Sequence, residues 1–277
     1  MEVKDILIPS AIIGVLGGLF ALILSLVAKK FGVEHDEKLE EVAGVLPGLN
    51  CGGCGFPSCF GYAESVYYHD HVPLTFCKPG GEAVAQELAR VLGRKAEPAE
   101  KKVAKLLCRG GKSRAHEAFS YKGPHTCHAA HLVKGGPLVC KEGCLGYGDC
   151  YRACTFDAIE MGKEGLPVID RDACVACGAC VETCPRGLIE LIPAESRVFV
   201  ECRNQDKGVL TTKACDVGCI ACRLCEKECP FDAIHVVDNV AKIDYDKCKN
   251  CGKCVLVCPR NIILQLPRVA SQTAQKT

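Results

Sequence analysis

Cysteine spacing constrains this chain more than any other feature of its sequence. In the C-terminal third, two runs of four cysteines have gaps of two, two and three residues, and a proline follows each run. The runs are Cys219, Cys222, Cys225 and Cys229 before Pro230, and Cys248, Cys251, Cys254 and Cys258 before Pro259. This spacing wraps two [4Fe–4S] clusters, and the fourth cysteine of each run ligates the cluster of the other run. The two runs therefore predict a pair of redox-active clusters.

Composition narrows the class of protein further. The chain has 277 residues, 24 cysteines and a formal net charge of +1. Such a cysteine content fits either a disulfide-stapled secreted protein or a metal-loaded one, and cysteines two residues apart favour metal. Structural zinc is the weaker metal interpretation, because it prefers pairs separated by longer loops. No basic stripe carries interleaved aromatic residues, so no nucleic-acid partner is expected.

An uncharged stretch near the N-terminus predicts a membrane anchor. Residues 6–28 are 23 residues without a charge, and about 34 Å of helix is enough to span a bilayer core. Charged residues precede the stretch, and a signal peptide would need a shorter apolar core; a buried soluble helix is the alternative. Lys29, Lys30 and Lys38 outnumber Lys4, which predicts a single-pass protein of the cell membrane with its long C-terminal part in the cytoplasm.

A first cluster site follows the anchor. Cys51, Cys54 and Cys59 are closely spaced, and Cys77 comes after seventeen intervening residues. Glycines at positions 52, 53 and 55 let the backbone approach a cluster. We expect a small, mostly helical [4Fe–4S] domain over residues 33–92, after an anchor over residues 1–32. A structural zinc site with the same four thiolates is the alternative.

An internal repeat organises the rest of the chain. One set of cysteines recurs further along the chain at a constant offset: Cys127, Cys140, Cys144, Cys150 and Cys154 as Cys202, Cys215, Cys219, Cys225 and Cys229. A second set recurs at an offset shorter by one: Cys174, Cys177, Cys180 and Cys184 as Cys248, Cys251, Cys254 and Cys258. An α+β fold follows, with two tandem 2[4Fe–4S] ferredoxin-like units over residues 127–195 and 196–277. A charged linker over residues 93–126 is expected to precede them, and each unit is expected to contain two short hairpins and two helices.

The first unit departs from the repeat at one ligand. Tyr147 stands where the second unit has Cys222, and Thr155 replaces the proline after Cys154. Cys140 lies four residues before Cys144 and is the predicted substitute, which leaves its counterpart Cys215 spare. We expect a cluster there with an altered potential, because the loop and its N–H···S bonds must differ.

Exchange of the fourth ligands between runs gives five predicted clusters, with no catalytic residue on the chain. The first set is Cys51, Cys54, Cys59 and Cys77; the second is Cys140, Cys144, Cys150 and Cys184; the third is Cys154, Cys174, Cys177 and Cys180; the fourth is Cys219, Cys222, Cys225 and Cys258; the fifth is Cys229, Cys248, Cys251 and Cys254. Four cysteines remain, and we expect them to pack as small hydrophobes, with a sixth cluster as the alternative: Cys108, Cys127, Cys202 and Cys215. His128 and His131 could bind zinc one helical turn apart, but solvated surface histidines are the simpler interpretation.

The order of these parts resembles the B subunit of Rnf-type complexes, the ion-translocating ferredoxin:NAD+ oxidoreductases of bacterial membranes. The resemblance rests on the anchor, the segment from Cys51 to Gly81, the segment Gly143–Cys150 and the ferredoxin-like runs. It implies a subunit of a translocating oxidoreductase that takes electrons from soluble reduced ferredoxin. It also implies relay through [4Fe–4S] clusters to membrane and peripheral partner subunits that hold the flavins and the NAD site, with outward transport of Na+ or H+.

Two other functions remain open from sequence alone. A related complex uses a similar subunit to keep a redox-sensing transcription factor reduced. The iron–sulfur wiring subunit of a membrane hydrogenase or formate dehydrogenase would carry comparable runs. We expect electrons to enter at the C-terminal units and to leave at the Cys51–Cys77 site, because that site lies nearest the anchor.

Overall fold

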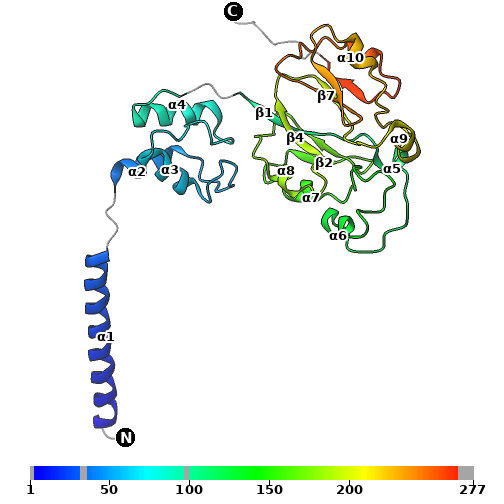
Figure 1. Cartoon of the computed structure of the whole chain (residues 1–277). Helices are drawn as coiled ribbons and strands as arrows, with labels where there is room; N and C mark the ends of the chain where they lie inside the picture. Colours follow the sequence, from blue (N-terminus) through cyan, green and yellow to red (C-terminus); the bar gives the residue numbers. More distant parts are fainter. Residues whose placement is uncertain (1–2, 32–35, 97–99, 268–277) are drawn as a thin grey trace, which may run out of the picture.

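The computed structural model describes residues 3–31, 36–96 and 100–267. Helix α1 (Val3–Phe31) is 29 residues long, and Figure 1 shows it as a single straight helix. The large apolar side chains described between Ile13 and Val27 are exposed. Among the described residues, no helix is both long enough and apolar enough to cross a membrane. The transmembrane anchor therefore stays a prediction, and its ends at residues 1–2 and 32 lie outside the described residues.

Three helices form the small domain that follows: α2 (Glu37–Val45), α3 (Cys59–Tyr68) and α4 (Gly81–Leu92). The Asp36 side chain caps α2 by accepting from the Lys38 amide at 3.1 Å. Ser58 caps α3 in the same way, through the Gly61 amide. Val42, Val66 and Leu88 are fully buried between the helices, so this mostly helical domain has its own apolar core.

The first ferredoxin-like unit has two antiparallel strand pairs and two short helices. Its elements are β1 (Lys102–Leu106), α7 (Asp149–Arg152), β2 (Ile159–Met161), β3 (Pro167–Ile169), α8 (Ala179–Thr183) and β4 (Ile189–Pro193). Strand β1 pairs with β4, and β2 pairs with β3. Of these two pairs, β2–β3 is a hairpin, whereas β1 and β4 lie at opposite ends of the unit's sequence. The prediction of two hairpins is therefore wrong for the β1–β4 pair.

The second unit repeats this order of elements. It consists of β5 (Val198–Val200), α10 (Leu224–Glu228), β6 (Ile234–Val237), β7 (Val240–Ile243), α11 (Lys253–Leu256) and β8 (Ile263–Gln265). Strand β5 pairs with β8 and β6 with β7, both antiparallel. The predicted tandem repeat is thus present in the backbone, and Figure 1 shows the two units against one another. At their junction Phe199 of β5 is fully buried in the core of the first unit, and Lys105 lies 2.6 Å from Glu201.

The structure differs from the predicted linker over residues 93–126. Part of this segment is β1, whose Val103, Ala104 and Leu106 are buried against β4. Helix α5 (Gly111–Arg114) follows, and Ala115 forms an isolated bridge with Cys215 of the second unit. The first unit therefore begins at β1 rather than at residue 127. The spacing of cysteines could not indicate this, because β1 finds its partner only at the far end of the unit's sequence.

Between β1 and α7 the first unit carries additional chain. This segment contains α6 (Cys127–Leu132). In the second unit the corresponding region contains α9 (Gly208–Ala214). The stretch from Cys108 to Cys140 is more than twice as long as the stretch from Cys202 to Cys215, so the first unit has room for a segment that the second unit lacks.

Candidate iron–sulfur centres

The second unit brings the fourth and fifth predicted ligand sets to the walls of two cavities of about 330 Å³ each. One cavity is lined by the thiols of the fourth set: Cys219, Cys222, Cys225 and Cys258. The other is lined by those of the fifth set: Cys229, Cys248, Cys251 and Cys254. In each cavity three thiols come from one run and one from the other, which is the exchange that the spacing predicts. Cys225 lies in α10 and Cys254 in α11, and these two helices contact each other.

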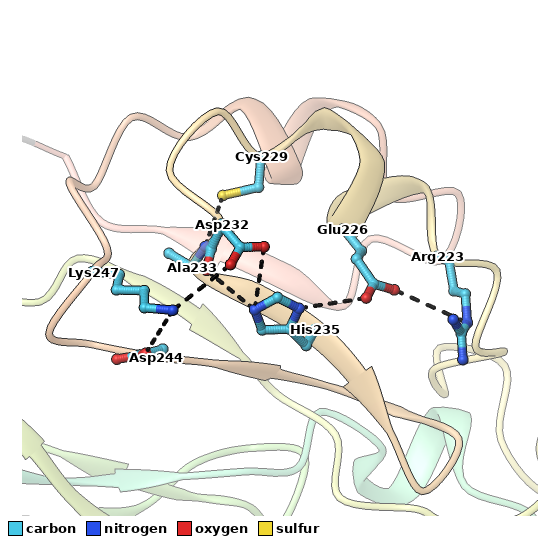
Figure 2. Close-up of polar contacts among 8 residues, drawn as sticks. All are labelled: Arg223, Glu226, Cys229, Asp232, Ala233, His235, Asp244 and Lys247. Atoms are coloured by element: carbon cyan, nitrogen blue, oxygen red, sulfur yellow. Dashed lines mark hydrogen bonds and ion pairs between the residues drawn. The ribbon is translucent and has the colours of Figure 1, made fainter.

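Backbone conformation at these loops turns the chain around each cavity. Ala221 and Arg223 have positive φ angles of 57° and 58°, and Gly252 has 78°. The Ala233 amide donates to the Cys229 sulfur at 3.4 Å, as Figure 2 shows. N–H···S bonds of this kind tune the potential of a cluster bound to the sulfur.

Polar side chains support this loop on the outer surface. The His235 ring lies between Glu226 and Asp232, with its Nδ1 3.4 Å from Glu226, and Figure 2 shows the row continuing to Arg223. Lys247 lies between Asp232 and Asp244, at 3.7 and 3.8 Å. These polar contacts are partly exposed, so each contributes little free energy alone. Together they hold the segment that follows Cys229.

The third predicted set also lies together in the first unit. Cys154, Cys174, Cys177 and Cys180 line a cavity of about 350 Å³. The Ala104 amide of β1 donates to the Cys174 sulfur at 3.4 Å. Strand β1 is therefore part of this site as well as of the sheet.

The second set differs from the prediction at one position. A cavity of about 400 Å³ is lined by Cys127, Cys144, Cys150 and Cys184, so Cys127 stands where Cys140 was expected. The Leu188 amide donates to the Cys184 sulfur at 3.3 Å. Burial raises the pKa of Cys150 to about 11, and charge on Cys127 and Cys184 adds to the rise. Charge on Cys127 also adds to the raised pKa of Cys144, after the larger effect of burial, so Cys127 lies near two members of the predicted set.

The additional segment of the first unit is fixed by a buried carboxylate. Asp149, 8% exposed, accepts from the His128 amide at 3.1 Å and contacts the His128 ring at 3.0 Å. Its other oxygen accepts from Arg152. Burial by itself raises the pKa of Asp149, but the hydrogen bonds outweigh burial and the pKa is lowered. These contacts hold the start of α6, and hence Cys127, beside α7. The second unit has Leu224 at the position equivalent to Asp149. This change from an apolar side chain to a carboxylate was the sequence signal for the contact between α7 and the start of α6.

The four N-terminal cysteines lie close enough to influence one another. Burial raises the pKa of Cys77, and charge on Cys59, Cys54 and Cys51 adds to the effect. The Asn50 amide donates to the Cys59 sulfur at 3.4 Å, and the Asn50 side chain accepts from the Cys59 amide at 2.8 Å. Gly80 allows close approach, because a Cβ there would lie 3.1 Å from the Cys77 sulfur.

This N-terminal site adjoins the third set. A Cβ on Gly53 would lie 3.0 Å from the Cβ of Cys177. Charge on Cys51 also contributes to the raised pKa of Cys177, after the larger effect of burial. The three-helix domain and the first ferredoxin-like unit therefore meet at two neighbouring cysteine sites.

The remaining four cysteines line a single cavity of about 360 Å³ between the two units: Cys108, Cys140, Cys202 and Cys215. Burial raises the pKa of Cys140 to about 12, and charge on the other three adds to the rise. Sequence reasoning left Cys108, Cys202 and Cys215 as packing residues and placed Cys140 elsewhere.

The donor sets fit iron–sulfur clusters. Five cavities of 330–400 Å³ are each lined by four cysteine thiols, and backbone amides donate to several of the sulfurs. Four thiolates around a roomy, largely apolar cavity are what a cubane cluster requires. In the described part of the chain, no group of three or more Cys, His or carboxylate side chains is arranged to hold a single metal ion. The fold and the sites thus define a ferredoxin-like iron–sulfur protein with several clusters.

Comparison with known proteins places the chain within this class. Three family models match: a putative Fe–S cluster domain at residues 46–79, a 4Fe–4S binding domain at 167–190 and a 4Fe–4S dicluster domain at 218–263. The chain is 43% identical to the B subunit of the Na+-translocating ferredoxin:NAD+ oxidoreductase complex of Acetobacterium woodii, over 93% of this chain and 77% of the relative. It is 45% identical to the B subunit of the proton-translocating complex of Clostridium ljungdahlii, over 90% and 88% of the two chains. The B subunit of an ion-translocating oxidoreductase complex of Methanosarcina acetivorans is 37% identical, over 94% and 98%.

The chain belongs to the B-subunit family of Rnf-type ion-translocating ferredoxin:NAD+ oxidoreductase complexes. The family predicted from the order of the sequence motifs is confirmed.

Proposed function

We propose that this chain is the electron-relay subunit of a membrane complex that oxidises ferredoxin, reduces NAD+ and moves an ion. The observation that carries the proposal is the unbroken series of thiol-lined sites from the three-helix domain to the second ferredoxin-like unit. The named relatives are subunits of complexes with this activity. These relatives favour this function over the two alternatives, which are reduction of a transcription factor and electron transfer within a hydrogenase or formate dehydrogenase.

Five ligand sets follow for [4Fe–4S] clusters, which when bound supply one-electron carriers. Four sets are those predicted from spacing. The second set becomes Cys127, Cys144, Cys150 and Cys184, because these four thiols line one cavity. The chain's own contribution is to hold the thiolates, exclude water and donate N–H groups to sulfurs such as those of Cys174 and Cys184.

Exposure of the ligands supports electron input at the second unit. Cys222 and Cys251 are exposed, whereas Cys150, Cys174 and Cys180 of the first unit are buried. Leu256, 87% exposed, and Leu224, 43% exposed, lie near these ligands in sequence and offer an apolar contact for a soluble ferredoxin. The N-terminal site is the first one after α1 in the chain, which supports output there toward membrane and peripheral partner subunits.

The proposal includes attachment to the cell membrane through α1, with the cluster domains on the cytoplasmic side. The exposed apolar side chains of residues 13–27 support it, as does the excess of lysines after the stretch.

A reduction experiment tests the function. The full chain, purified anaerobically with its clusters, is mixed with reduced ferredoxin, and cluster absorbance is followed by stopped flow. We expect rapid bleaching to the extent that dithionite produces. A chain that dithionite reduces and ferredoxin leaves oxidised would contradict the proposal.

A variant tests the proposed output. In the assembled complex, Cys51→Ala combined with Cys54→Ala should stop electron transfer from ferredoxin to NAD+. Reduction of the remaining clusters of this chain by ferredoxin should continue. Normal NAD+ reduction by the variant would show that electrons leave elsewhere.

A further inference from the structure

We infer that Asn250 is a positioning residue of the fifth ligand set: its side chain holds the exposed loop from Cys248 to Cys251 in the conformation that binds a cluster. The inference rests on the proposed function, because it takes the fifth set to hold a [4Fe–4S] cluster. It deepens that function, since it names a residue that keeps an exposed part of the relay in order.

The equivalent loop of the first unit is covered by a neighbouring domain. This loop runs from Cys174 to Cys177, and a Cβ on Gly53 of the three-helix domain would lie 3.0 Å from the Cβ of Cys177. Cys177 is accordingly half-buried, whereas Cys251 at the equivalent position is exposed. The loop of the second unit must therefore be held by other contacts.

The side chain of Asn250 supplies such contacts. Its Oδ1 accepts from the Arg197 amide at 2.8 Å and from the Val198 amide at 3.3 Å. Its Nδ2 donates to the Glu195 carbonyl at 3.3 Å. These three partners lie where β4 of the first unit connects to β5 of the second. The loop of the fifth set is thus fastened to the connection between the two units.

The backbone of Asn250 completes the attachment. Its carbonyl accepts from the Gln265 side chain at 2.8 Å, which links the loop to β8. Its φ angle is 53°, a left-handed conformation that asparagine adopts more readily than most residues. Ala176 has nearly the same angle, 56°, at the equivalent position of the first unit. Both loops therefore share one backbone turn, and the second unit adds a side chain that fixes it.

This turn aims a backbone N–H group at a predicted cluster ligand. Burial raises the pKa of Cys248, and a hydrogen bond from the Asn250 amide opposes the rise. N–H···S bonds stabilise the more negative, reduced form of a cluster and so raise its potential. The Asn250 side chain therefore acts on the cluster through its own backbone, because it fixes the direction of this N–H group.

The β6–β7 turn provides a matched control. Asn239 has a φ angle of 62° in that turn, and its Nδ2 donates to the Gln205 carbonyl at 3.0 Å. It is an asparagine in the same left-handed conformation, and it belongs to none of the ligand sets. Substitution of Asn239 therefore shows what loss of a left-handed asparagine costs away from a cluster.

Release of iron to a chelator is the first test, made on the loaded full-length chain after anaerobic purification. Asn250→Ala should release about four irons about ten times faster than the wild type, because loss of a contact that orients a metal ligand typically costs at least this factor. Asn239→Ala should release iron at the wild-type rate. The same rate in Asn250→Ala and in the wild type would overturn the inference.

Two further variants separate the side-chain contacts from the turn itself. Glycine adopts a positive φ without strain, so Asn250→Gly tests the contacts alone and should release iron as fast as Asn250→Ala. Asn250→Asp keeps an oxygen that accepts from the Arg197 and Val198 amides and should release iron near the wild-type rate. A glycine variant as slow as the wild type, or an aspartate variant as fast as the alanine variant, would contradict the positioning role.

The reduction potential is a readout that a merely structural role would not move. In a dithionite titration followed by electron paramagnetic resonance, Asn250→Ala should lower the midpoint of one signal and leave the others in place. Cys251→Ser identifies that signal, because it changes a ligand of the same cluster. An unchanged midpoint, or an equal shift of every signal, would refute the inference.

The two proposals fail separately, because none of these measurements uses ferredoxin. A chain whose fifth cluster responds to Cys251→Ser but not to Asn250→Ala contradicts only the positioning role. A chain in which Asn250→Ala has the expected effects, and which ferredoxin leaves oxidised, contradicts only the proposed function.

Discussion

In the second ferredoxin-like unit one short loop supplies three thiols, Cys219, Cys222 and Cys225. In the first unit Tyr147 takes the middle position, and Cys127 reaches the cavity from an additional segment. Charge on Cys127 also acts on Tyr147, which agrees with their lying near one another. A ligand lost from a tight loop can thus be replaced from a distant part of the chain while the strands and helices stay the same. The replacement leaves Cys140 outside this ligand set, and it lines the cavity at the junction together with Cys108.

The largest expected effect comes from removal of the replacement ligand. Cys127→Ala should cost about four irons and remove one cluster of the first unit. Cys222→Ala, the matched change in the second unit, should cost the same amount from a different cluster. Iron analysis and resonance spectra of the two variants check this. Retention of full iron by Cys127→Ala would show that Cys140 serves this cluster instead.

Restoring the missing thiolate sharpens the comparison. Tyr147→Cys places a thiol where the second unit has Cys222, so the double variant Cys127→Ala/Tyr147→Cys should regain most of the lost iron. The tyrosine ring is also removed, which gives a cluster room at this position. Cys127→Ala/Tyr147→Ser is the control and should stay depleted. Equal iron in the two double variants would contradict the equivalence of Tyr147 and Cys222.

Arg186 and Arg260, which stand at equivalent positions of the two units, should differ in their effect on stability. Arg186 is buried and donates to three carbonyls, whereas Arg260 is half-buried and donates to two. Arg186→Ala leaves buried carbonyls without a donor and should cost about 3 kcal/mol. Arg260→Ala should cost about half of that, since water reaches its carbonyls. Anaerobic denaturant unfolding of the loaded protein measures both, and a larger loss for Arg260→Ala would reverse the interpretation.

The smallest effect is expected at the junction between the units. Lys105 of β1 forms a partly buried ion pair with Glu201 after β5, and it also lies over the Phe199 ring at 4.7 Å. Lys105→Met keeps the side-chain length and should cost about 1 kcal/mol. Lys242→Met removes an exposed pair with Asp238 in the β6–β7 hairpin and serves as the control, with little change in unfolding free energy. Equal effects would mean that the junction pair is as weak as a surface pair.

Local signals in the sequence predicted much of the fold and four of the proposed ligand sets. Three cysteines within seven residues must lie on one turn of chain, so sets such as Cys248, Cys251 and Cys254 can be read directly. Strand β1, which precedes Cys108, could not be predicted in this way, because its partner β4 is remote in sequence and its five residues carry a weak pattern. The constant offset relates Cys127 to Cys202, and this correspondence was misleading. The residue of the first unit with the same contacts as Cys202 is Cys108, because the additional segment carries Cys127 to another cavity. Long-range pairing, which spacing does not encode, decides which thiols share a cavity.

An iron anomalous difference map of the loaded full-length chain would show directly which thiols share each cluster. We expect one cubane cluster at each of the five proposed ligand sets, including one bonded to Cys127, Cys144, Cys150 and Cys184. A cluster bonded to Cys140 beside Cys144, with Cys127 free, would contradict this assignment of the ligands.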